Sequence, residues 1–219
     1  MQIHGQQLWA TPMFFVHNEH ADSLHPPIIE HLYTLRSRES ERIASGVAAG
    51  AKSDYGLFES KFDLFKSELP QMKALTRFIG NALAHAVVQA NGGTDDPRDV
   101  RVCAIESWFH ITNESGYHDA HHHHGCSWCG IYYVQIGDGV TDELRHNGIS
   151  RFYSPLAIGG AYQDYGTEYL QTGTYNVKPE EGMLVLFPSY LLHSALPYKG
   201  EKDRIVIAFN GQVTRRQDG

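Results

Sequence analysis

Residues 117–136 read Tyr-His-Asp-Ala-His-His-His-His-Gly-Cys-Ser-Trp-Cys-Gly-Ile-Tyr-Tyr-Val-Gln-Ile, a histidine run that leads into an apolar, strand-like segment. Imidazole is the commonest metal ligand among protein side chains. In an extended chain successive side chains point to opposite faces, so His121 and His123 project to one face. His122 and His124 then project to the other. The sequence therefore predicts a pair of metal ligands beside a strand. An expression tag is excluded, because tags lie at termini.

The composition is that of an ordinary globular protein and argues against two classes of partner. The chain has 219 residues, 42% of them hydrophobic and 20% charged, and we expect one domain over residues 1–219. A formal net charge of -7 without a long Lys/Arg run argues against nucleic acid. No apolar run is long enough to cross a membrane, and no secretory signal is evident, so we expect a cytoplasmic protein without membrane association. The sequence does not indicate an oligomeric state.

Helical patterns dominate the first part of the chain, mainly residues 20–92. A short segment at 8–16 could be an edge strand. Ser23 is expected to cap a first helix whose first turn holds Pro26 and Pro27. Apolar residues at helical spacing predict a second helix over about 70–90. These helices are expected to brace one face of a β unit.

Strand patterns dominate the remainder, and the β core is expected mainly over residues 100–213. A cluster of turn-forming residues at 91–97 marks the transition. Short strands without intervening helical patterns favour an antiparallel sandwich or barrel over a parallel α/β sheet. The expected strands are 100–111, 130–136, 149–153, 173–177, 183–187 and 204–209. Aromatic residues expected to pack in this core are Trp108, Tyr132 and Phe209.

His193 is the best candidate for a third metal ligand. It follows an apolar strand and a proline turn, where the chain can cross the mouth of a barrel. Arg204 then opens the last core strand. A guanidinium is permanently charged and binds carboxylates through two parallel hydrogen bonds. The sequence thus predicts a metal ligand and a carboxylate-binding group as neighbours.

The order and spacing of these motifs resemble the Fe(II)- and 2-oxoglutarate-dependent oxygenase superfamily. More narrowly, they resemble its bacterial and phage branch of oxygenases similar to prolyl hydroxylases. Residues 116–134 and 181–210 carry the resemblance, and residues 52–61 resemble the N-terminal region of that branch. The resemblance implies a mainly β fold with helices (α+β), a double-stranded β-helix or jelly roll braced by N-terminal helices.

The resemblance also implies a site and a reaction. His121, His123 and His193 would hold Fe(II), while Arg204 would bind the distal carboxylate of 2-oxoglutarate with help from the hydroxyl of Tyr133. The enzyme would be a dioxygenase that uses O2 to hydroxylate an unactivated C–H bond and releases succinate and CO2. The substrate would be a small molecule or a protein side chain. Loops at 137–147 and 157–169 are expected to recognise the substrate, but their sequences do not indicate its chemical class.

One ligand departs from the superfamily pattern, in which two histidines and one carboxylate usually hold iron. The second position here is His123. A shifted triad of Asp119, His121 and His193 is an alternative; otherwise Asp119 could orient a ligand imidazole. Cys126 and Cys129 have the spacing of zinc and redox motifs but lack a matched second pair. We expect them to be small strand residues, with zinc held by His and Cys of this segment as the alternative.

Two other classes of function remain alternatives. A cupin-like dioxygenase or isomerase acting without 2-oxoglutarate would suit three histidines. It would leave Arg204 without a role, and the glutamate that cupins commonly carry after the histidine pair is missing from residues 125–128. A non-catalytic, histidine-rich metal-binding protein would explain the density of histidines. It would explain neither His193 nor the arginine that follows it.

Overall fold

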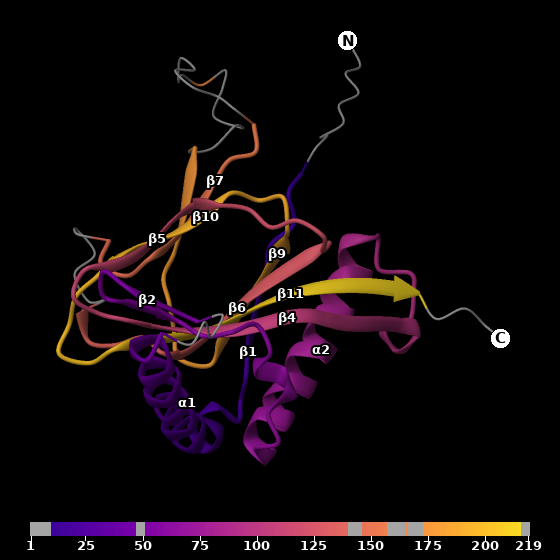
Figure 1. The fold of residues 1–219 in the computed structure, drawn as a ribbon. Coiled ribbons are helices and arrows are strands. Elements are labelled where there is room, and N and C mark those ends of the chain that lie inside the picture. Colours follow the sequence, from indigo (N-terminus) through magenta and orange to yellow (C-terminus); the bar gives the residue numbers. More distant parts are fainter. Residues whose placement is uncertain (1–9, 47–50, 140–145, 157–164, 166–172, 216–219) are drawn as a thin grey trace, which may run out of the picture.

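The structure is a computed structural model that describes residues 10–46, 51–139, 146–156, 165 and 173–215. Within these residues two antiparallel sheets lie one above the other, and two helices cover the outer face of the larger sheet (Figure 1). This arrangement confirms the expected jelly roll braced by N-terminal helices. The expected recognition loops lie largely outside the described residues.

The larger sheet has the strand order β1-β9-β6-β11-β4-β3-β2, and the smaller sheet has the order β5-β10-β7-β8. The helices are α1 (Ala21–Ala44) and α2 (Pro70–Ala90), with short 3-10 turns η1 (Leu64–Lys66) and η2 (Pro97–Asp99). The strands are β1 (Phe14–His17), β2 (Lys52–Asp54), β3 (Leu57–Glu59), β4 (Val100–Thr112), β5 (Gly116–His121), β6 (Trp128–Gln135), β7 (Ser150–Tyr153), β8 (Thr174–Val177), β9 (Met183–Pro188), β10 (His193–Tyr198) and β11 (Arg204–Arg215).

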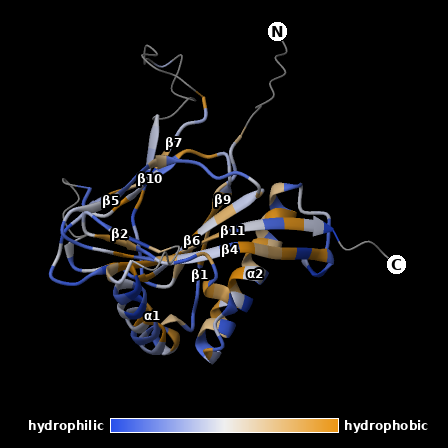
Figure 2. Ribbon diagram, in the orientation of Figure 1, coloured by the Kyte–Doolittle hydropathy of each residue, from blue (hydrophilic) through white to orange (hydrophobic). Residues whose placement is uncertain are grey.

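Alternation along the strands separates two hydrophobic cores, because successive side chains leave a sheet on opposite faces. On β6, Tyr132 and Val134 pack in the core shared with the helices, which also contains Leu32 and Leu83. Tyr133 packs in the second core, between the sheets. Figure 2 shows that both helices carry hydrophobic and hydrophilic sides. The helices thus cover one face of the larger sheet, and the other face is left for a site between the sheets.

The start of α1 differs from the prediction, whereas α2 has the predicted bounds. The N-cap of α1 is His20, so the prediction that Ser23 caps this helix is wrong. Ser23 Oγ instead donates to the carbonyl of His20 at 2.9 Å, a backward bond that serine can make inside a helix. Pro26 and Pro27 consequently lie beyond the first turn. In the part of the chain that the structure describes, no helix has the length and apolar character needed to cross a membrane.

Candidate metal centre

Three histidines meet between the two sheets. The candidate donor atoms of His121, His123 and His193 all lie within 4.8 Å of one another. His121 ends β5 and is paired with His193, the first residue of β10. Their ring centroids are 4.3 Å apart, and the ring of His123 lies 5.3 Å from that of His193. Nitrogen donors must be this close to share one metal ion, so the arrangement can hold one.

The other two histidines of the run lie apart from this cluster. His122 and His124 are exposed, with ring centroids 4.5 Å apart. The run leaves the β-ladder after His121, but its side chains still alternate. The backbone N–H of His123 donates to the carbonyl of Ser189 at 3.0 Å, which ties this extension to the end of β9.

Two of the three imidazoles are oriented by backbone carbonyls. Nδ1 of His121 lies 2.6 Å from the carbonyl oxygen of Asp119, and Nδ1 of His193 lies 2.9 Å from that of Leu191. A carbonyl can only accept, so Nδ1 carries the proton and Nε2 keeps its lone pair. Asp119 itself is exposed, and among the described residues its carboxylate joins no cluster of candidate metal ligands. Its contact with His121 is through the backbone.

The histidines are electrically neutral at physiological pH. Burial, reinforced by neighbouring histidines, lowers the pKa of His193 to about 3 and that of His123 to about 4. Burial also lowers the pKa of His121. A metal binds the neutral imidazole, so protons compete little for these nitrogens near pH 7.

Arg204 lies at the other end of the same space and is only 2% exposed. Its Nη2 donates to Ser150 Oγ at 3.2 Å, and the hydroxyl of Tyr133 donates to the same oxygen at 2.8 Å. Within the described residues, Nε of Arg204 has no hydrogen-bond partner and no carboxylate pairs with this guanidinium. A buried, unpaired charge is costly. The site therefore fits a ligand that brings its own carboxylate, as 2-oxoglutarate does.

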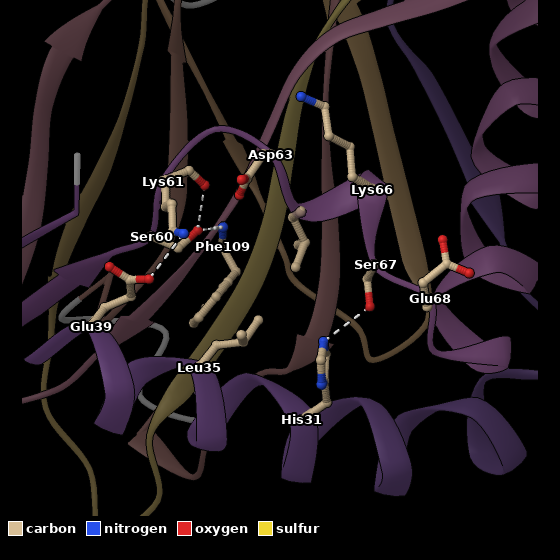
Figure 3. Close-up of a pocket in the computed structure, with 11 residues that line it drawn as sticks. His31, Leu35, Glu39, Ser60, Lys61, Asp63, Lys66, Ser67, Glu68 and Phe109 are labelled. Atoms are coloured by element: carbon tan, nitrogen blue, oxygen red, sulfur yellow. Dashed lines mark hydrogen bonds and ion pairs between the residues drawn. The ribbon is translucent and has the colours of Figure 1, made fainter. Parts of the chain in front are cut away.

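One cavity of about 40 Å³ joins these groups; Trp108, Ser150, Arg204 and the three histidines are among the residues that line it. Trp108 is 5% exposed, its ring lies 5.7 Å from that of His123, and its Nε1 has no partner within the described chain. Sequence reasoning assigned Trp108 to packing and overlooked Ser150, which carries no motif. A larger pocket of about 300 Å³, between α1 and the η1 region, contains none of the three histidines (Figure 3).

The cysteine pair lies at the start of β6. Cys126 Sγ and Cys129 Sγ are 3.8 Å apart and both thiols are free. Cys129 is buried, and its thiol donates to Oδ1 of Asn210 at 3.2 Å. Neither cysteine belongs to a group of candidate metal donors in the described parts of the chain. Cys129 is thus a small strand residue on β6, as predicted, whereas Cys126 precedes the strand, so the prediction is wrong for Cys126.

Residues 106–210 match the sequence model of a family described as "Putative 2OG-Fe(II) oxygenase". No curated protein sequence matches the chain. The matched segment runs from β4 into β11 and contains the three clustered histidines, Tyr133 and Arg204. Over these residues, a little under half of the chain, the protein is therefore similar to a family whose description names Fe(II) and 2-oxoglutarate.

Solved structures support the fold. A prolyl hydroxylase from Trichoplax adhaerens, in complex with a hypoxia inducible factor peptide fragment, has a TM-score of 0.56 at 12% identity, covering 91% of this chain and 83% of that one. HygX from Streptomyces hygroscopicus, with nickel, 2-oxoglutarate and hygromycin B bound, has a TM-score of 0.55 at 12% identity, covering 92% and 83%. AviO1 from Streptomyces viridochromogenes Tue57 has a TM-score of 0.51 at 16% identity, covering 85% of each chain. At identities this low, the likeness shows a shared fold and nothing more.

Proposed function

We propose that the protein hydroxylates an unactivated C–H bond, with iron held by His121, His123 and His193 and with the distal carboxylate of 2-oxoglutarate held by Arg204. The observation that carries the proposal is the buried guanidinium of Arg204. It lacks a carboxylate partner among the described residues and lines the same cavity as three neutral imidazoles. A ligand that bridges these two ends needs a carboxylate at one end and metal-binding oxygens at the other, and 2-oxoglutarate has both.

Iron and 2-oxoglutarate, when bound, supply the oxidising chemistry with O2, releasing succinate and CO2. The chain supplies binding and orientation. The carbonyls of Asp119 and Leu191 fix two imidazoles so that Nε2 faces the metal position. Ser150 Oγ accepts from both Tyr133 and Arg204 and so holds the guanidinium in place. The buried ring of Trp108 helps to exclude water from the cavity.

The substrate is proposed only as a class. Two structures with this fold hold very different partners, a peptide fragment in one and hygromycin B in the other. A small molecule and a protein side chain are therefore both consistent with the proposed reaction. A cupin-like enzyme is the second candidate, favoured by the absence of a carboxylate from the three-histidine cluster. Binding of 2-oxoglutarate separates the two.

The test is to add 2-oxoglutarate to the Fe(II)-loaded protein without oxygen and to record the visible charge-transfer band of the chelate. We expect a band in the wild type and weaker 2-oxoglutarate binding by calorimetry in Arg204→Ala. Arg151→Ala is the matched control, because Arg151 lies on β7 and is bound to Asn176. Absence of the band and of cosubstrate binding in the wild type would refute the proposal.

The ligand set has its own matched pair. His123→Asn removes a proposed ligand, whereas His122→Asn changes the adjacent, exposed histidine. We expect the first variant to lose metal binding and the second to retain it. Equal metal affinity in both variants would show that His123 does not bind the metal.

A further inference from the structure

A buried carboxylate lies behind the histidine cluster. Glu59, on β3, is only 5% exposed, and β3 pairs Glu59 directly with His110 on β4. Nε2 of His110 lies 3.0 Å from Oε2 of Glu59 and donates to it. Nε2 of His118 lies 3.5 Å from the same oxygen. On the other side of the carboxylate, Nζ of Lys52 lies 3.3 Å from Oε1. Glu59 is neither one of the proposed iron ligands nor part of the proposed 2-oxoglutarate site.

His118 connects Glu59 to the metal centre. Nδ1 of His118 lies 3.1 Å from Nδ1 of His121, and the two ring centroids are 4.2 Å apart. The other nitrogen of His118 faces Glu59. A continuous path of polar contacts therefore runs from a buried carboxylate, through one imidazole, to an imidazole of the cluster.

The protons along this path can be assigned. Nδ1 of His121 carries a proton, because it also faces the carbonyl of Asp119. That single proton lies between two acceptors, the carbonyl of Asp119 and Nδ1 of His118. Nδ1 of His118 therefore has no proton of its own, and the proton of His118 is on Nε2, toward Glu59. Burial alone would raise the pKa of Glu59, but hydrogen bonds from His110 and His118 leave that pKa well below its usual value. Glu59 is therefore an anion: it accepts a hydrogen bond from His110 at 3.0 Å, and Nε2 of His118 lies at a longer polar distance of 3.5 Å.

The same residues could be suspected of forming a second metal site, since candidate donor atoms of Glu59, His110 and His118 lie within 4.8 Å of one another. Proton positions argue against it. If Nε2 of His118 bound a metal, its proton would move to Nδ1 and point at the Nδ1 proton of His121 only 3.1 Å away. Two donors cannot satisfy each other. If His121 binds iron, polar contacts among Glu59, His110 and His118 agree with the proton positions, and a second metal ion does not.

We propose that Glu59 is a positioning residue for the metal centre, acting through His118 to orient His121 and to strengthen it as a ligand. This inference rests on the proposed iron site. Ligating histidines typically pass their second ring proton to an acceptor that raises the basicity of the ligand. A three-histidine set also lacks the negative charge of the usual carboxylate ligand. Glu59 supplies that charge one imidazole away from the ligand.

The test compares two buried glutamates. Glu59→Gln keeps the shape of the side chain and removes its charge. Glu39→Gln is the matched control: Glu39 is also 5% exposed and bound by a lysine, with Lys61 Nζ at 3.1 Å, but it lines the separate pocket of Figure 3. Co(II) binding is measured by calorimetry without 2-oxoglutarate. We expect Glu59→Gln to bind Co(II) about 10- to 100-fold more weakly and Glu39→Gln to bind it like the wild type.

A spectroscopic readout separates a positioning role from a merely structural one. The d–d bands of bound Co(II) are expected to shift in Glu59→Gln, because a weaker ligand changes the metal's electronic environment. His118→Asn is expected to cause a similar loss of affinity, and the double variant to lose no more than either single variant. If Glu59→Gln does not fold, His118→Asn, at a partly exposed position, carries the test.

Three outcomes would overturn the inference. The first is wild-type Co(II) affinity and wild-type bands in a folded Glu59→Gln or His118→Asn variant. The second is an equal loss of Co(II) affinity in Glu39→Gln. The third is a wild-type chain that binds two Co(II) ions, one of which is lost in Glu59→Gln. Because Co(II) binding is measured without 2-oxoglutarate, this test does not depend on cosubstrate binding. Weaker Co(II) binding in Glu59→Gln together with no 2-oxoglutarate binding would refute the proposed function alone, whereas a wild type that binds no Co(II) would refute both.

Discussion

At the scale of single residues, Ser150 organises the carboxylate end of the cavity. Its Oγ accepts from two buried donors, Tyr133 and Arg204. Ser150→Ala removes that acceptor, and an unsatisfied buried donor costs about 1–3 kcal/mol. We expect 2-oxoglutarate to bind roughly 10-fold more weakly by calorimetry, since about 1.4 kcal/mol corresponds to a factor of ten. Ser107→Ala, which removes a buried hydroxyl that accepts from the backbone of Phe65, is the control. Unchanged affinity in Ser150→Ala would refute this role.

His193 makes the stability of the metal-free protein depend on pH. Burial and neighbouring histidines lower its pKa to about 3, against 6.5 for the unfolded chain. Between these values the unfolded chain binds more protons, so the free energy of unfolding falls as the pH falls, by about 1.4 kcal/mol per pH unit. Urea unfolding at pH 7, 6 and 5 with a chelator present measures the slope. His193→Asn should show a shallower slope; equal slopes would contradict the assignment.

Individual site residues differ in how far sequence could identify them. The clustered histidines and Arg204 were found because their chemistry is distinctive and their order along the chain resembles a known pattern. Glu59 lies within residues 52–61, which resemble the N-terminal region of that branch, but the sequence assigned it no role. It lies far from His110 and His118 in sequence, and only the pairing of β3 with β4 brings it to them. Long-range pairing of this kind leaves no local trace in composition or periodicity.

At the scale of elements, strands with a local sequence pattern could be predicted, whereas strands that depend on long-range pairing could not. The expected strands from 100 to 209 are confirmed, because each has an apolar or alternating pattern. The expected strands did not include β2, β3, β5 or β10. β10 contains Pro197, and its pairing with β5 has two register shifts. It forms because β5 and β7 flank it on both sides. β11 continues beyond the predicted end because β4 offers partners as far as Arg215.

Alanine substitutions at two glycines, one on a closely packed strand and one on a helix, are expected to change stability in opposite directions. A Cβ at Gly130, on β6, would lie 2.3 Å from the ring of Phe209 and 3.0 Å from Leu186. Gly130→Ala is therefore expected to destabilise the protein by about 1–3 kcal/mol through overpacking. A Cβ at Gly80, inside α2, meets nothing within 4 Å, and Gly80→Ala should stabilise by about 0.5–1 kcal/mol. Urea denaturation measures both; a neutral Gly130→Ala would contradict the packing argument.

At the scale of the whole molecule, the two faces of the larger sheet have separate tasks. The outer face and the helices bury one hydrophobic core, and the inner face and the smaller sheet enclose the site. His121 and His193 come from the smaller sheet, whereas Arg204 comes from the larger one. Metal and cosubstrate would therefore bind across both sheets, and their binding should be coupled to folding.

That coupling predicts the effect of metal removal. A ligand that binds only the folded chain stabilises it by about 2.7 kcal/mol at 100 times its Kd. For a chain of this size, each kcal/mol in the free energy of unfolding shifts the thermal unfolding midpoint, Tm, by about 2–4 °C. Chelation should therefore lower the Tm by roughly 5–10 °C. Calorimetric scans with Co(II) and with a chelator measure the difference. His122→Asn should keep the shift, because its side chain is exposed and outside the cluster. His193→Asn should abolish it; a shift that persists there would place the metal elsewhere.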